Sequence, residues 1–135
     1  MKYLTHVLAT ALAASAATGI AAAEGAATTK TLCAITSTLT CDVAGCVRGP
    51  ANAVNLPVFV SIDTENNVVE AAREGGDRRT SKISSTRTQG DTLVLLGGEL
   101  ERGWSATVDQ VSGNFTGTVA DNGVGYIIFG SCLAY

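Results

Sequence analysis

Hydrophobic and polar residues alternate along most of the chain, which is the pattern of β-strands with one buried face. Residues 104–110 show it most clearly, because Trp104, Ala106 and Val108 share one face while hydroxyl and carboxyl side chains share the other. No stretch of helical periodicity follows residue 31. Alternating runs bounded by turn residues predict strands at 32–40, 57–63, 67–72, 81–88, 92–97, 104–110, 114–120 and 125–133.

The connections between these runs are mostly short, which predicts an all-β antiparallel meander of about eight short strands. Such a meander either closes into a small barrel or folds into a two-layer sandwich, and the pattern leaves both open. The run 81–88 is mostly polar, with Ile83 as its clearly apolar residue, so we expect an edge or a weak seam there. Residues 47–56 form the one long connection, with room for a single turn of helix.

Two predicted hairpins share one pattern, an aspartate at the end of a strand followed by polar turn residues. Residues 61–69 align with residues 107–115, so that Asp63 corresponds to Asp109. An aspartate at the entry of a turn accepts hydrogen bonds from backbone N–H groups, and asparagine or glycine at the exit tolerates the left-handed conformation. We interpret the similarity as shared hairpin chemistry, with ancestral duplication as the alternative.

The first residues of the chain have the composition of an export signal. Lys2 precedes an Ala/Leu-rich apolar stretch over residues 4–19, and small residues follow where a signal peptidase requires them. The short basic start and the Ala-x-Ala ending indicate a bacterial protein of the periplasm or the exterior. A retained membrane anchor is the alternative. The predicted organisation is a cleaved helical signal peptide at 1–23, a flexible leader at 24–31 and a single disulfide-stapled β domain at 32–135.

All four cysteines follow the predicted signal, and an even number of cysteines in an exported protein predicts disulfide bonds. Bonding Cys33 to Cys41 is disfavoured, because eight residues of strand span about 26 Å whereas bonded cysteines lie within about 7 Å. Of the two remaining pairings, we favour Cys41 with Cys46 and Cys33 with Cys132. The alternative to structural bonds is a redox-active Cys41–Cys46 pair, although its spacing is not CxxC. In a continuous strand, one face would carry Cys33, Ile35, Leu39 and Cys41.

Charge and composition exclude several classes of function. The net charge is −3, and it becomes −4 without the signal, which contains Lys2 and no acidic residue. A mildly acidic chain lacks the clustered basic residues that bind nucleic acid. The only histidine, His6, lies in the signal, so the mature chain lacks Ser-His-Asp catalysis, Cys-His catalysis and most zinc sites. We therefore predict no metal, no cofactor and no enzymatic activity.

Two features remain as candidate binding sites. Arg78, Arg79 and Lys82 follow a glycine pair, and such a basic loop could bind an anion or an acidic protein surface. The alternative is a solvated hairpin tip. Trp104 lies on the inward face of its strand, and we interpret it as a core anchor or as the floor of a ligand cavity in a small barrel.

These observations favour a non-catalytic binding module. Its partner would be another exported protein, such as a hydrolase that it inhibits, or a small apolar ligand held in a barrel cavity lined by Trp104, Phe115 and Phe129. Two alternatives stay open, a histidine-free enzyme that uses carboxylates and a small outer-membrane barrel. Most predicted strands are shorter than the about 9–11 residues of membrane strands, so we expect no stable membrane insertion after signal cleavage.

Overall fold

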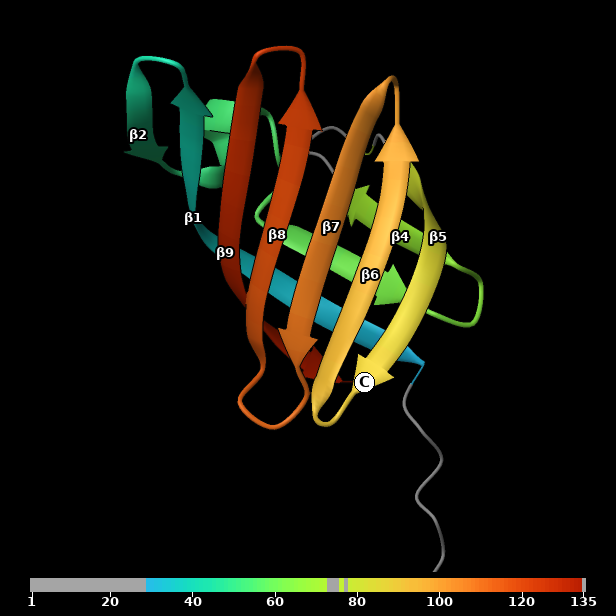
Figure 1. Cartoon of the computed structure of the whole chain (residues 1–135). Helices are drawn as coiled ribbons and strands as arrows, with labels where there is room; N and C mark the ends of the chain where they lie inside the picture. The colour runs from blue at the N-terminus through green and yellow to red at the C-terminus, as the bar shows by residue number, and fades with distance from the viewer. Residues whose placement is uncertain (1–28, 73–75, 77, 135) are drawn as a thin grey trace, which may run out of the picture.

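The computed structural model describes residues 29–72, 76 and 78–134, so the predicted signal peptide lies outside the described residues. The described chain is all-β, with nine strands and one short 3₁₀ helix, η1 (Ala51–Val54) (Figure 1). The strands are β1 (Lys30–Asp42), β2 (Gly45–Gly49), β3 (Phe59–Asp63), β4 (Val68–Ala72), β5 (Arg78–Gln89), β6 (Thr92–Glu99), β7 (Arg102–Asp109), β8 (Asn114–Asp121) and β9 (Val124–Ala134). All of them except β2 coincide with a predicted strand.

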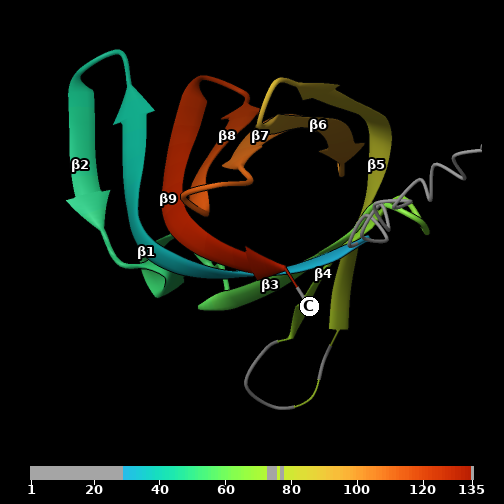
Figure 2. The same ribbon diagram turned by 90° about the horizontal axis from the view of Figure 1, so that it is seen from below.

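Eight strands form a closed antiparallel barrel, so the barrel and not the sandwich is the correct one of the two predicted folds. From β3 to β9, each strand pairs with the next one along the chain, as the short connections require. β1 pairs with both β3 and β9, which closes the ring seen from below in Figure 2. β2 lies outside this ring and, among the described residues, pairs with β1 alone.

A β-bulge divides β1 into two halves with different neighbours. The register of β1 against β9 shifts by one residue between Ile35 and Ser37, which breaks the alternation of inward residues. Ile35 faces the core at 7% exposure, and the next buried residue is Thr38 at 1%. The expectation that Leu39 and Cys41 share the face of Ile35 is therefore wrong, because it assumed an unbroken period of two.

β2 occupies part of the segment that the sequence predicted to be a connection. Residues 45–49 pair with residues 38–42 of β1, and the Cys41–Cys46 disulfide ties the two strands together. The prediction of a connection throughout 47–56 is wrong at its start, because a five-residue strand with a glycine at each end has almost no pattern of its own and depends on its partner strand. The expected single turn of helix is present as η1.

The mostly polar strand β5 joins two parts of the barrel wall. Residues 78–82 pair with β4, whereas residues 82–89 pair with β6, and a second bulge lies between Ile83 and Ser85. Apart from the point where the two pairings meet, each half of β5 is paired on one side among the described residues. The arrangement agrees with the weak seam that was predicted at 81–88.

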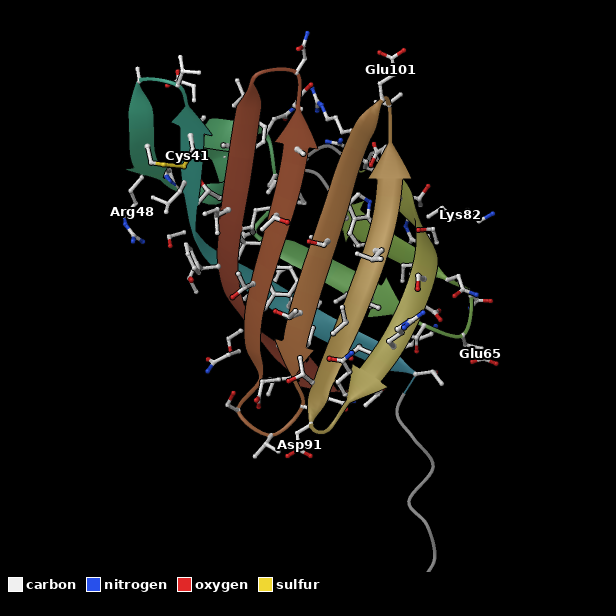
Figure 3. All side chains as sticks on the ribbon, in the orientation of Figure 1. Cys41, Arg48, Glu65, Lys82, Asp91 and Glu101 are labelled. Carbon is white, nitrogen blue, oxygen red and sulfur yellow. A yellow bond between two sulfur atoms is a disulfide. The ribbon has the colours of Figure 1, made fainter. Side chains whose placement is uncertain are left out.

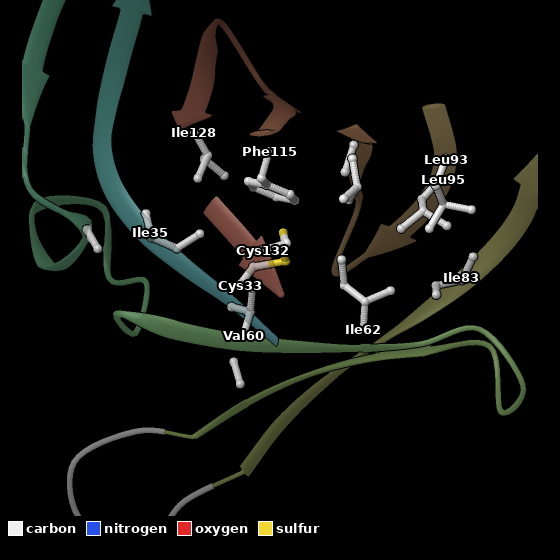
Figure 4. Packing of buried hydrophobic residues seen from close by; sticks show 14 residues of the cluster. Cys33, Ile35, Val60, Ile62, Ile83, Leu93, Leu95, Phe115, Ile128 and Cys132 are labelled. Atoms are coloured by element: carbon white, nitrogen blue, oxygen red, sulfur yellow. A yellow bond between two sulfur atoms is a disulfide. The ribbon is translucent and has the colours of Figure 1, made fainter. Parts of the chain in front are cut away.

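The core of the barrel is a single cluster of apolar side chains (Figure 4). Cys33 on β1 and Cys132 on β9 lie directly opposite each other, and their disulfide belongs to this cluster. Both predicted disulfides are confirmed, and none of the described cysteines is free. The buried members of the cluster are Cys33, Ile35, Ala51, Val60, Ile62, Ala71, Ile83, Leu93, Leu95, Ala106, Val108, Phe115, Ile128 and Cys132.

The two aligned aspartate turns have the same geometry. Asp63 accepts a hydrogen bond from the backbone N–H three residues later at 2.9 Å, and Asp109 accepts the corresponding bond at 2.7 Å. The residues at the turn exits, Asn67 and Gly113, have φ angles of 54° and 75°, in the left-handed region. The predicted hairpin chemistry is confirmed at both turns.

These turns make stability sensitive to acid. Donation from the Asn66 side-chain amide and from the Ser112 backbone N–H lowers the pKa of Asp63 and of Asp109, respectively, below the ordinary value of 3.8. The unfolded chain takes up these protons first, so each turn stabilises the fold above about pH 4 and loses that contribution as the pH falls through the lower pKa of the folded state. We expect the Tm of the Asp63→Asn, Asp109→Asn double variant to fall less than that of the wild type between about pH 4 and pH 2.

The control for this titration is Asp91→Asn in the β5–β6 turn, where the carboxylate accepts no hydrogen bond from the described residues. This variant should follow the wild-type profile of Tm against pH in a calorimetric series. An identical fall of Tm in the double variant and in the wild type would contradict the role of the two turns.

Candidate functional site

A cavity of about 370 Å³ lies inside the barrel. Its deep walls are core side chains, among them Ile62, Leu95 and Phe115. Small residues occupy inward positions on two other strands, Ala71 on β4 and Ala106 on β7, where larger side chains would fill the space that the barrel encloses. The hollow interior therefore follows from side-chain size at particular positions.

The polar part of the lining lies at the end of the barrel that carries the β6–β7 and β8–β9 hairpins (Figure 1). Exposure to solvent rises toward this end. Leu95, deep in β6, is 0% exposed, whereas the side chains of Glu99 at the end of the same strand and of Arg102 at the start of β7 are 22% and 43% exposed. The lining at this end is therefore in contact with solvent, and we call this end of the cavity the mouth.

The last residue of η1 and the segment that follows it supply one wall of the cavity. Val54, Leu56 and Pro57 line it, next to the barrel strands. The chain just before η1 is anchored to the second half of β1, because the buried Thr38 hydroxyl lies 3.1 Å from the backbone oxygen of Gly49, the last residue of β2, and can donate to it. The bulge that breaks the alternation of β1 is thus also what places this anchor inside the molecule.

Trp104 is a wall of the cavity and also packs against the core. Its ring lies across Gly97 of β6, where a Cβ atom would overlap the ring and the backbone oxygen of Lys82. The indole N–H donates to the Ser81 hydroxyl on β5 at 2.8 Å. The side chain therefore spans from β7 over β6 to β5, and it combines the two roles that the sequence left open.

Two ion pairs occupy the mouth. The Arg79 Nε donates to Glu99 Oε1 at 2.7 Å, and both side chains line the cavity. The Arg102 Nε lies 2.7 Å from Asp121 Oδ2, and Arg102 also lines the cavity. Tyr126 of β9 joins them in the lining. The mouth therefore presents guanidinium, carboxylate and phenol groups around an apolar interior.

The structure does not bring the three predicted basic residues together. Strand alternation turns Arg79 into the barrel, and Arg78 and Lys82 lie on the outer surface. Arg78 forms an exposed ion pair with Glu70 at 3.6 Å, and Lys82 points away from the barrel (Figure 3). The sequence treated the three as one loop, but residues 78–82 are a paired strand whose neighbours face opposite ways.

Phe129 is a second correction to the predicted lining. Trp104 and Phe115 line the cavity, whereas Phe129 lies on the outer face of β9, where the Arg48 guanidinium lies 6.0 Å from its ring centroid. The alternation of β9 turns the adjacent Ile128 inward instead.

The sequence also missed several lining residues, namely Glu99, Arg102 and Tyr126. Opposite charges at the two ends of a short hairpin were visible in the sequence, but their direction depends on register. The register of each strand in the barrel decides which of these charged side chains point inward and meet.

These groups suit binding by shape and hydrogen bonding. Within residues 29–72, 76 and 78–134, no three histidine, cysteine, aspartate or glutamate side chains lie close enough to hold a metal ion. None of the helical residues described forms a segment long and apolar enough to cross a membrane. Comparisons with family models, curated proteins and solved structures find no match to the chain.

Proposed function

We propose that this chain is a small exported bacterial binding protein that holds a small, mostly apolar ligand inside its barrel. The observation that carries the proposal is the cavity of about 370 Å³ with an apolar interior and a few polar groups at one end. Ligand sites in proteins have volumes of about 300–1,000 Å³ and this same distribution of apolar walls and sparse polar groups. A barrel selected for stability alone would gain from larger side chains at Ala71 and Ala106.

The cellular location belongs to the same proposal. Two disulfides are typical of proteins from oxidising compartments. Together with the predicted signal peptide at 1–23, they support export to the periplasm or the exterior of a bacterium. A carrier or sensor of apolar molecules needs no catalytic group, which agrees with a mature chain that lacks histidine.

Trp104 provides a direct test, because it is the only tryptophan of the chain and lines the cavity. Octan-1-ol is a suitable probe, since it joins a short apolar chain to one small polar group. We expect a saturable change in Trp104 fluorescence as octan-1-ol displaces water from the cavity, and a parallel rise in Tm, since a ligand that binds only the folded state stabilises it.

Two substitutions on adjacent positions of β7 give a matched pair for this experiment. Ala106 faces the cavity and Thr107 faces solvent. Ala106→Leu should fill the cavity and abolish the fluorescence response, whereas Thr107→Leu should leave it intact. A response that never saturates, or one that Ala106→Leu leaves unchanged, would show that the probe does not bind inside the barrel.

A further inference from the structure

The charges at the mouth balance one another. Among the described residues, the lining contains the cations Arg79 and Arg102 and the anion Glu99. Asp121 adds the second anion, because it is paired with Arg102 at 2.7 Å. Counted over the described residues, the rim therefore holds two cationic and two anionic side chains, each engaged with a partner, and these charges sum to zero.

Partial burial makes this balance matter for a ligand. The side chains of the Arg79–Glu99 pair are 28% and 22% exposed, so both groups have lost much of their contact with water. An anionic ligand head would compete with Glu99 for the Arg79 guanidinium and would be repelled by the carboxylate. A cationic ligand head would compete with Arg79 for the Glu99 carboxylate and would be repelled by the guanidinium. A third charge beside a satisfied, partly dehydrated pair has no counter-ion of its own.

An uncharged polar head meets no such conflict. Tyr126 lines the cavity, and the described residues supply no hydrogen-bond partner for its hydroxyl. This hydroxyl can donate a hydrogen bond to a ligand in the cavity or accept one from it. The Arg79 guanidinium donates to Glu99 through Nε, so its terminal N–H groups remain able to donate to a neutral oxygen.

We infer that the cavity takes an uncharged amphiphile, an apolar body with a hydroxyl, carbonyl or amide end, and that the inward ion pair Arg79–Glu99 excludes charged analogues. This inference rests on the proposed function, because it specifies the ligand class of the same cavity. The outward pair Arg78–Glu70 on the neighbouring face supplies the internal comparison, since it has the same chemistry but lies outside the barrel.

The test compares three probes with the same apolar chain, octan-1-ol, octanoate and octylammonium, by Trp104 fluorescence at neutral pH. The wild type should bind octan-1-ol most tightly. Glu99→Gln leaves Arg79 without its carboxylate, and we expect it to tighten octanoate relative to octan-1-ol by about fivefold, the factor that corresponds to one partly exposed ion pair. Arg79→Gln should shift the ratio toward octylammonium by a similar factor.

Glu70→Gln is the matched control, because it removes the same charge from the outer surface and should leave all three affinity ratios unchanged. Far-UV circular dichroism and Tm check that every variant is folded. A wild type that prefers octanoate, or a Glu99→Gln variant with the ratio of Glu70→Gln, would overturn the inference while leaving the cavity a binding site. If none of the three probes binds the wild type, the proposed function itself fails.

Discussion

Replacing Cys33 and Cys132 together by alanine is expected to lower the free energy of unfolding by about 4–5 kcal/mol, the largest effect that we anticipate for any pair in this chain. The bond joins residues 99 apart in sequence, so it removes a large amount of conformational entropy from the unfolded chain. It also ties β1 to β9, the pairing that closes the barrel. Alanine is the suitable replacement, because both positions are buried and a serine hydroxyl would need a hydrogen-bond partner there.

The second disulfide gives the comparison. Cys41 and Cys46 are five residues apart on an exposed hairpin outside the barrel, so their double replacement should cost about 2 kcal/mol. Urea unfolding followed by circular dichroism measures both losses. Equal losses for the two pairs would mean that loop length does not govern their contributions, and that the closure of the barrel is carried by strand pairing alone.

Much of the barrel could be predicted because its local chemistry is regular. Where one face of a strand is buried, alternation marks the strand without any knowledge of its neighbours, and eight strands were located in this way. The aspartate turns were predictable for the same reason, since the hydrogen bonds of Asp63 and Asp109 lie within their own turns. The length of a strand disfavoured a bond between Cys33 and Cys41, and of the two remaining pairings the favoured one is the one observed.

The features that could not be predicted depend on residues far apart in sequence. The bulge after Ile35 shows no marker in the local pattern, yet it moves Thr38 into the interior and frees the second half of β1 to hold β2. β2 itself exists through its pairing and its disulfide. Length and alternation predict an antiparallel meander that closes into a barrel or folds into a sandwich, but they cannot predict where a strand changes its inner face.

The site was predictable in part for the same physical reason. Trp104 was recognised as a core or cavity residue, because a lone tryptophan on the inward face of a strand usually packs in the interior. Arg79 was grouped with Arg78 and Lys82 in one basic loop, but its partner is Glu99. That residue lies 20 positions later, and strand pairing brings it to the mouth. The volume of the cavity depends on which small residues face inward at one level, which requires the register of the whole barrel.

The surroundings of Trp104 indicate that removing its side chain destabilises the barrel wall. Its ring contacts the core, covers Gly97 and reaches Ser81 across an intervening strand. It thereby connects β5, β6 and β7 at the level where small residues leave the barrel hollow. A rigid side chain that crosses three strands stabilises the wall of a cavity that the core does not fill.

Trp104→Ala should therefore lower the free energy of unfolding by about 3 kcal/mol, near the lower end of the range for large aromatic residues, since the ring is partly exposed to the cavity. Ser81→Ala removes only the hydrogen bond and should cost about 1 kcal/mol. Leu96→Ala serves as the control, because Leu96 lies on the outer face of β6 at 46% exposure and should cost about 0.5 kcal/mol. Urea unfolding followed by circular dichroism, which does not depend on the tryptophan signal, measures all three. A Trp104→Ala loss no larger than that of Leu96→Ala would mean that the ring lies against the cavity without supporting it, and that the barrel wall is held by backbone pairing and by the core beneath.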